Sequence, residues 1–160
     1  MLSTVEKVIL LKSMDFFADT SEDVLLDVAS ILEEVDVPPG ETFLQKGTLD
    51  SSLYLLIEGQ VRIHDDNRTV AELQPGDVIG ELALLDPAPR SASVTAVGEV
   101  SLFRLDQAPF YELLDDRVEI ARKMLQVLAR RLRRSSGPGK AERARDDLLG
   151  GLEERLTRPT

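Results

Sequence analysis

The first part of the chain carries hydrophobic residues at helical spacing, which predicts two helices before any strand. After a break at residues 13–18, the sequence Thr20-Ser21-Glu22-Asp23 has the polar cap and acidic first turn of a second helix. The first helix is expected over residues 2–12, with an apolar side of Leu2, Val5, Val8, Ile9 and Leu11. The second is expected to end near Glu34, with a buried stripe of Val24, Leu25, Val28, Ile31 and Leu32.

From Val35 onward the hydrophobic period changes from that of a helix to that of a strand. The turns between the apolar runs contain Gly40, Gly47, Gly59 and Gly76, where a positive φ is expected. Short strands with evenly spaced, glycine-rich turns favour a small antiparallel β-roll of the jelly-roll type. The predicted strands are residues 41–45, 52–57, 60–64, 69–73, 93–96 and 100–105.

Helical spacing returns after the last predicted strand. Pro109 suits the first turn of a short helix, and a longer helix is expected over residues 117–134. One apolar stripe of the longer helix is expected to pack on the barrel and the other on the same helix of a second copy of the chain. Alternatively, both stripes pack within one chain. The stripes are a heptad seam of Val118, Ala121, Leu125, Leu128 and Leu132, and a neighbouring stripe of Ile120, Met124 and Val127.

These patterns predict one α+β domain over residues 1–134, in which an antiparallel β-roll is flanked by helices. N-terminal helices are expected over residues 1–34, the roll over 35–106 and C-terminal helices over 107–134. Residues 135–160 start with a run of serine, glycine and proline and continue with many charges. We therefore expect them to form a flexible charged tail.

Composition narrows the class of protein. The chain has 160 residues, of which 42% are hydrophobic, and this is enough for a core. It has no cysteine, which excludes disulfides and thiolate metal sites and fits the reducing cytoplasm, where we expect the protein to act. Its start lacks the features of a signal peptide, and no run approaches the roughly 18 apolar residues that span a membrane, so no membrane partner is expected.

Charge is unevenly distributed along the chain. Residues 1–116 hold 7 Lys and Arg against 23 Asp and Glu, a net charge of −16, whereas residues 117–160 hold 12 against 6, a net of +6. The acidic body would repel a nucleic acid. We interpret the arginines of residues 130–134 as cations that favour a helix C-terminus, and expect no nucleic-acid partner.

The segment from Ile79 to Val94 has the features of an anion pocket. Gly80 and Glu81 open a short apolar run of helical character, and Arg90 follows nine residues after Glu81. A helix start offers free backbone N–H groups, and an arginine adds a fixed charge with a forked set of donors. The Glu81 carboxylate adds acceptors that suit hydroxyl groups.

This segment resembles the phosphate-binding cassette of the cyclic nucleotide-binding domain family, the β-roll family of catabolite activators, kinase regulatory subunits and nucleotide-gated channels. Members carry Gly-Glu-x-Ala-Leu, a short loop and then Pro-Arg-(Ala/Ser/Thr)-Ala-(Thr/Ser)-Val. Residues 80–84 and 89–94 match every element of that pattern. Beyond the cassette the resemblance extends over roughly residues 5–134 as a pattern of strands and turns.

The resemblance implies a regulatory module, and it implies a role in ligand binding for each matching position. Arg90 would bind the cyclic phosphate, Glu81 would accept a hydrogen bond from the ribose 2′-hydroxyl, and Gly80 would lie against the ribose. The helix over 117–134 would cover the ligand. Backbone N–H groups would come from Leu82, Ala83, Ser91 and Ala92, and the base would lie against Val61 and Ile63. Cyclic AMP is favoured over cyclic GMP by its frequency in the family, and Ser91 is compatible with either.

Other functions remain open at this point. The same fold can act as an interaction or scaffold domain that binds no nucleotide. A transcription regulator would need a helix-turn-helix, and no two-helix pattern of that kind follows residue 134. A metal-dependent barrel enzyme would need several histidines, and His64 is the only one, so neither a metal nor catalytic residues are expected. Expected partners are a cyclic nucleotide, a second copy through residues 117–134 and a protein still to be identified.

Overall fold

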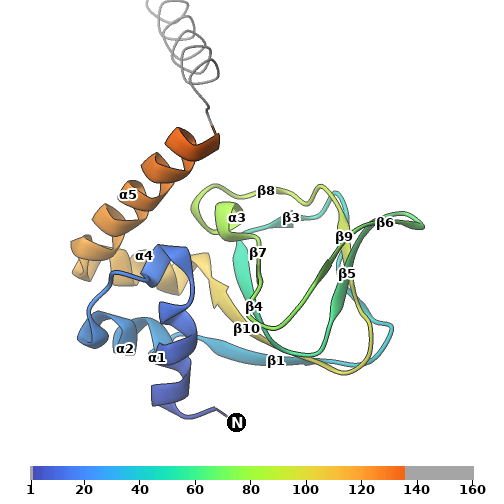
Figure 1. The fold of residues 1–160 in the computed structure, drawn as a ribbon, viewed down its shortest axis with the longest axis horizontal. Helices are drawn as coiled ribbons and strands as arrows, with labels where there is room; N and C mark the ends of the chain where they lie inside the picture. Colours follow the sequence, from blue (N-terminus) through green and yellow to red (C-terminus); the bar gives the residue numbers. More distant parts are fainter. Residues whose placement is uncertain (1, 136–160) are drawn as a thin grey trace, which may run out of the picture.

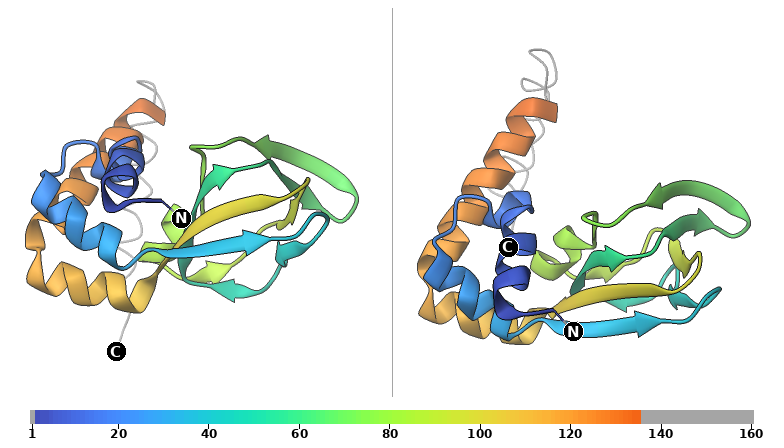
Figure 2. Two further views of the ribbon diagram at one scale, coloured as in Figure 1. Left: turned by 90° about the horizontal axis from the view of Figure 1, so that it is seen from below. Right: turned by 60° about the horizontal axis from the view of Figure 1, so that its bottom comes forward.

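The computed structural model describes residues 2–135, in which helices gather on one side and strands form a roll on the other (Figure 1). Both further views keep this division (Figure 2). None of the helices in this described part is long and apolar enough to cross a membrane. The helical side consists of α1 (Thr4–Lys12), η1 (Asp15–Phe17), α2 (Glu22–Ser30), α4 (Gln107–Asp116) and α5 (Val118–Ser135).

The roll consists of antiparallel strands throughout. One sheet has the order β1-β10-β4-β7, a second has the order β2-β9-β5-β6, and β3 pairs with β8. This arrangement confirms the α+β class and the antiparallel roll flanked by N-terminal and C-terminal helices. The strands are β1 (Glu33–Val37), β2 (Thr42–Leu44), β3 (Leu49–Asp50), β4 (Ser52–Glu58), β5 (Val61–Asp65), β6 (Arg68–Leu73), β7 (Val78–Ile79), β8 (Ala88–Pro89), β9 (Ser93–Ala96) and β10 (Val100–Asp106).

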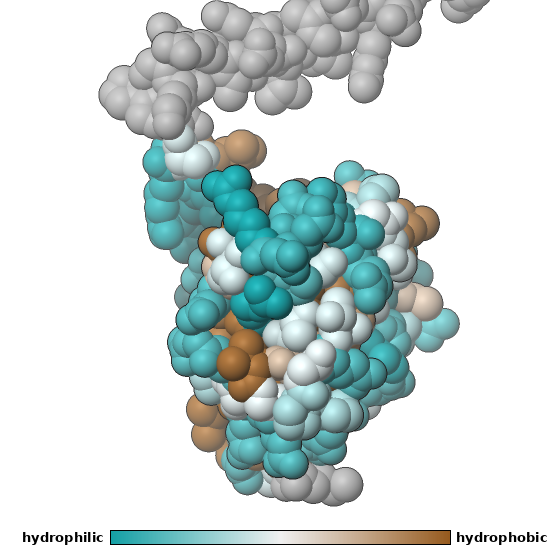
Figure 3. Space-filling model, turned by 90° about the vertical axis from the view of Figure 1, so that its right-hand side faces the viewer, coloured by the Kyte–Doolittle hydropathy of each residue, from teal (hydrophilic) through white to brown (hydrophobic). Residues whose placement is uncertain are grey.

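Strand β4 separates two hydrophobic cores. Its side chains alternate between faces, as in any strand. Leu53 and Leu55 pack in the core of the helical side, whereas Tyr54 and Leu56 pack inside the roll. The end of the roll that faces the viewer in Figure 3 is mostly hydrophilic, with small hydrophobic patches. The strands therefore turn their apolar faces inward, and the roll and the helical side share β4 as a common wall.

The first helix uses a narrower apolar face than its sequence indicates. Val8 and Leu11 are buried, but Val5 and Ile9 are exposed. The helix packs mainly against α2 and η1. Its two buried side chains, Val8 and Leu11, are three residues apart and so lie on one face of the helix. The expectation of an apolar side that includes Val5 and Ile9 is wrong.

The second helix also ends earlier than expected. Helix α2 stops at Ser30, and residues 33–34, which we expected to be helical, are the start of β1. Glu33 and Glu34 pair with Arg104 and Phe103 of β10, and the Glu33 carboxylate forms an ion pair with Arg104. Pairing with a distant strand thus decides the conformation of these residues over their local helical pattern.

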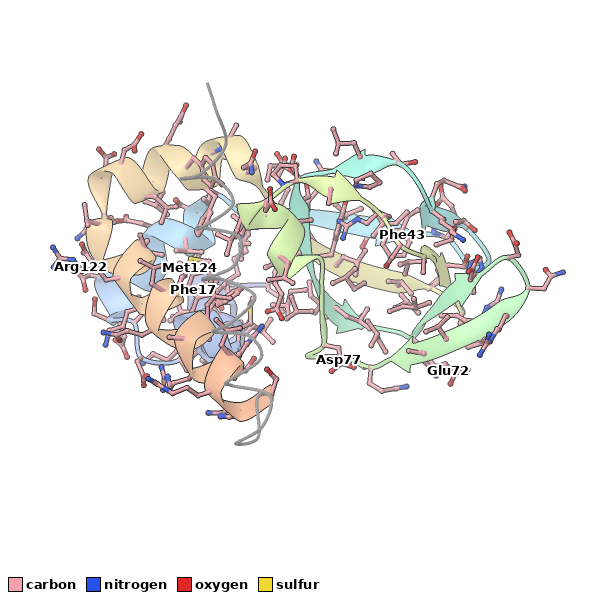
Figure 4. All side chains as sticks on the ribbon, turned by 90° about the horizontal axis from the view of Figure 1, so that it is seen from above. Phe17, Phe43, Glu72, Asp77, Arg122 and Met124 are labelled. Atoms are coloured by element: carbon pink, nitrogen blue, oxygen red, sulfur yellow. The ribbon has the colours of Figure 1, made fainter. Side chains whose placement is uncertain are left out.

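The long helix α5 packs mainly on η1 and α4, and its buried stripe shares a core with side chains of β4 and β10. Ile120, Met124 and Val127 are buried in the core of the helical side, and Figure 4 shows Met124 beside Phe17. Arg122 points away from the body of the molecule in the same view. The seam residues Val118 and Leu125 are exposed on α5. The expected tail falls almost wholly on residues 136–160, which lie outside the described part of the chain.

Candidate functional site

The segment between β7 and β8 forms the short helix α3 (Glu81–Leu85), which lies between the helical side and the roll (Figures 1 and 4). Gly80 precedes it with φ 78°, in the left-handed region that favours glycine. A cavity of about 790 Å³ opens beside α3. Most of residues 78–94 line it, together with Ile63 of β5 and Leu128 of α5. The segment singled out in the sequence is therefore the wall of a cavity large enough for a small ligand.

The structure brings nearly all of the predicted site residues to this cavity. Ile63 contributes from β5, but Val61 does not line the cavity. Val61 is fully buried in the interior of the roll, opposite Ala96 of β9. Val61 lies on the same face of β5 as Ile63 but belongs to the hydrophobic core of the roll. The structure therefore places it away from the candidate base position. The predicted residues that line the cavity are Gly80, Glu81, Leu82, Ala83, Arg90, Ser91 and Ala92.

Arg90 is held by a carboxylate that the sequence analysis missed. Its Nη2 lies 2.7 Å and its Nε 3.2 Å from Oδ2 of Asp50, and Nη2 also donates to the Ser52 carbonyl at 2.9 Å. Only 10% of the Arg90 side chain and 16% of the Asp50 side chain are exposed. The pairing of β3 with β8 places Asp50 beside Ala88, close to Arg90. These strands are so short that their sequence gives no periodic signal.

The Asp50 carboxylate also accepts a hydrogen bond from the backbone of Ser52. The Ser52 amide donates to Asp50 Oδ1 at 3.0 Å, and the Ser52 hydroxyl donates to Asp106 at 2.6 Å. Nη1 of Arg90 has no hydrogen-bond acceptor within residues 2–135 and lies next to Gly80. The guanidinium is thus fixed by two of its nitrogens while the third remains able to donate to an anion in the cavity.

Glu81 is engaged by the long C-terminal helix. Arg131 of α5 donates from Nη1 to Glu81 Oε1 at 2.6 Å and from Nη2 to Oε2 at 3.2 Å. The hydrogen bonds that the Glu81 carboxylate accepts raise the pKa of Arg131, which favours the charged guanidinium in this pair. Arg131 is one of the arginines that we interpreted as helix-end cations, and its contact with the cassette was not expected from the sequence. It connects the cassette directly to α5.

Helix α4 holds the other end of α3. Gln107 donates from Nε2 to the Leu84 carbonyl at 2.9 Å, and the Tyr111 hydroxyl donates to the Leu85 carbonyl at 2.8 Å. The last carbonyls of a helix have no partner within it, so these side chains satisfy them. Helix α3 is therefore bound to α5 at its start and to α4 at its end.

The electrostatics of the site are local. The net charge of the chain is −10, so an anion gains nothing from its overall field. Burial raises the pKa of the Tyr54 phenol, which keeps this side chain neutral near Asp50 and Arg90. An anion in the cavity therefore depends on Arg90 and on nearby backbone N–H groups, while Glu81 offers acceptors for hydroxyl groups.

The chain is similar to known proteins both in sequence and in fold. A CRP-like cAMP-activated global transcriptional regulator of Mycobacterium tuberculosis is 38% identical over 110 residues, which are 66% of this chain and 49% of that protein. The chain thus spans about half the length of this relative. The N-terminal domain of a transcriptional regulator from Streptomyces coelicolor has a TM-score of 0.75 and 34% identity, covering 79% of this chain and 92% of that structure.

A further solved structure is the regulatory domain of Toxoplasma gondii PKA in a co-crystal with cAMP. It has a TM-score of 0.63 and 28% identity, with 71% of this chain and 45% of that one covered. The sequence model of the cyclic nucleotide-binding domain matches residues 34–117, a little over half of the chain. This match contains the whole cassette and the strands that position it. The chain therefore belongs to the cyclic nucleotide-binding domain family.

Proposed function

We propose that the protein is a regulatory module that binds cyclic AMP in the cavity beside α3. The observation that carries the proposal is the convergence of Gly80, Glu81 and Arg90 on one cavity wall, with Arg90 fixed by Asp50. Arg90 would donate to the cyclic phosphate, and Glu81 would accept from the ribose 2′-hydroxyl. This combination of a fixed cation and a carboxylate suits a ligand with one anionic and one hydroxyl-bearing group.

Adenine is the preferred base in this proposal. The Mycobacterium tuberculosis relative is cAMP-activated, and the Toxoplasma gondii structure holds cAMP. Ile63 of β5 and Leu128 of α5 provide apolar wall of the cavity. Ser91 lines the cavity beside Arg90 and can donate to either purine.

A thermal unfolding experiment tests the proposal. Cyclic AMP at about 100-fold its dissociation constant is expected to stabilise the protein by near 2.7 kcal/mol. Cyclic GMP should need a higher concentration for the same shift in Tm, and linear AMP should have no effect, because its phosphate lacks the cyclic geometry. The absence of a shift with every cyclic nucleotide would favour the alternative of an interaction domain that binds no nucleotide.

We also propose that two copies associate through α5. The seam residues Val118 and Leu125 are 51% and 67% exposed, although the neighbouring stripe of the same helix is fully used in the core. A second α5 would cover these two exposed residues as in a coiled coil. Sedimentation equilibrium is expected to give a dimer for the unchanged protein and a monomer for Leu125→Glu. A monomer at high concentration, with and without cyclic AMP, contradicts this assembly.

A further inference from the structure

The exposed face of α5 has the same pattern in both directions along the helix. We infer that two copies of the chain pair through this face with their α5 helices antiparallel. This pairing rests on the association through α5 proposed above and adds the direction in which the two helices run. It concerns a surface outside the ligand site, because none of the exposed residues of α5 is among those that line the cavity.

The exposed positions of α5 between residues 118 and 133 lie on one side of the helix. They follow one another at steps of 1, 3, 3, 1, 3, 3 and 1 residues, and this series is the same from either end. A two-fold interface uses the same patch on both copies, so an antiparallel partner brings the whole face onto its counterpart. Figure 4 shows Arg122 of this face pointing away from the body of the molecule. The exposed positions are Val118, Glu119, Arg122, Leu125, Gln126, Ala129, Leu132 and Arg133.

A strip of three large hydrophobic side chains runs along this face. Val118, Leu125 and Leu132 recur every seven residues and are 51%, 67% and 62% exposed. In an antiparallel pair, Leu125 contacts Leu125 of the second copy, and Val118 contacts Leu132 of the second copy. Each copy therefore covers the strip of the other along its full length, which removes apolar surface from water.

The polar flank of the face is complementary to itself when the helices run in opposite directions. Glu119, Gln126 and Arg133 form this flank, again seven residues apart. Antiparallel helices bring the same flank of both copies together, so Glu119 of each copy lies beside Arg133 of the other. The Glu119 carboxylate lies 3.5 Å from Nη1 of Arg117 in its own chain, and it keeps acceptor positions for a second partner. The two-fold symmetry forms this contact twice.

The middle of the face disfavours a parallel pair. Arg122 and Ala129 lie there, between the hydrophobic strip and the polar flank. In a parallel pair each would meet its own counterpart near the two-fold axis, which places two arginine charges together and is unfavourable. In an antiparallel pair Arg122 lies beside Ala129 of the second copy, whose small side chain leaves room for the guanidinium. Size and charge thus favour the same direction.

Cysteine cross-linking tests the direction, because the chain has no cysteine of its own. Arg122→Cys and Ala129→Cys each introduce a single thiol in the middle of the face. In an antiparallel pair the two variants should link to each other in a mixture under mild oxidation, while neither should link to itself. Two copies of one variant would hold their thiols about 10 Å apart along the helix, and a disulfide needs Cα atoms within about 7 Å. Mass spectrometry of the covalent dimers identifies the variants that they contain.

A charge reversal gives a second measurement. Arg133→Glu places two carboxylates together on the flank of an antiparallel pair, and it should weaken the dimer by about tenfold in sedimentation equilibrium. The double variant Glu119→Arg/Arg133→Glu restores opposite charges and should recover most of that loss. A double variant that dissociates as readily as Arg133→Glu alone would contradict the contact between these two residues.

Val70→Cys is the matched control for the cross-linking. Val70 of β6 is 63% exposed and lies outside α5, so its mixture with Arg122→Cys should give no link. A covalent dimer of Arg122→Cys alone or of Ala129→Cys alone would show parallel helices and overturn the inference. A dimer in sedimentation equilibrium that gives no cross-link at all would overturn it too, because the copies would then meet elsewhere. A monomer in every sample contradicts the association itself, whereas titration of the same samples with cyclic AMP tests the ligand function separately.

Discussion

Arg90→Ala is expected to weaken cyclic nucleotide binding by roughly 10²-fold or more, the largest loss from any change to a side chain of the cavity. Among the described residues that line the cavity, Arg90 is the only Lys or Arg. The surrounding chain is acidic, so no general field compensates for its loss. Isothermal titration with cyclic AMP measures the change directly.

The same substitution also affects the stability of the roll. Without Arg90, the Asp50 carboxylate is left largely buried and without its charged partner. Breaking a buried ion pair on one side costs about 3–5 kcal/mol in the free energy of unfolding. A loss of binding by Arg90→Ala must therefore be separated from a loss of folded protein, which thermal unfolding of the same sample measures.

The double variant Asp50→Asn/Arg90→Gln separates the two effects. It removes both charges together, so most of the stability should return, because neither side chain is left as an unpaired charge. Binding should stay weak, since none of the cavity-lining residues in the described part of the chain would then carry a positive charge. Asp50→Asn alone should bind more weakly than the unchanged protein, because Arg90 loses the partner that orients it. Tight binding of cyclic AMP by the double variant would contradict the assignment of Arg90.

The cassette could be predicted because its chemistry lies in one continuous segment. Gly80, Glu81 and Arg90 are close in the sequence, and residues 80–94 carry the whole family pattern. The residues that hold them are distant. Asp50 is 40 positions from Arg90, and Arg131 is 50 positions from Glu81. Nothing in the local sequence around Asp50 or Arg131 distinguishes them from the many other charged residues of the chain.

The fold shows the same division between local and distant information. The turn glycines could be predicted from short-range patterns, and Gly40, Gly47, Gly59 and Gly76 all have positive φ. The start of β1 could not, because residues 33–34 continue a helical pattern and become a strand only by pairing with β10. The exposed side of α1 was also unpredictable, since it depends on which neighbours the helix meets.

Gly80→Ala is expected to lower both the stability of the protein and its affinity for the ligand. Gly80 lines the cavity and lies directly against the side chain of Arg90. The φ of 78° alone costs a residue with a side chain about 1–2 kcal/mol. A Cβ at this position would overlap Arg90 Nη1 and would lie 2.7 Å from Arg90 Nη2 and 2.8 Å from the Ser52 carbonyl oxygen. The added methyl group would push the guanidinium away from Asp50. The backbone would also have to shift, because the carbonyl belongs to β4 and lies too close as well.

Gly40→Ala is the matched control for this prediction. Gly40 has φ 80°, almost the same as Gly80, and a Cβ built there meets nothing within 4 Å. Both variants should therefore lose stability to backbone strain, but only Gly80→Ala should bind cyclic AMP more weakly, by about tenfold or more, because only there is the phosphate-binding arginine displaced. Thermal unfolding and isothermal titration of the two variants side by side make the comparison. Equal affinities in the two variants would mean that Arg90 keeps its place despite the added methyl group, and the close packing of Gly80 against Arg90 would then have no part in binding.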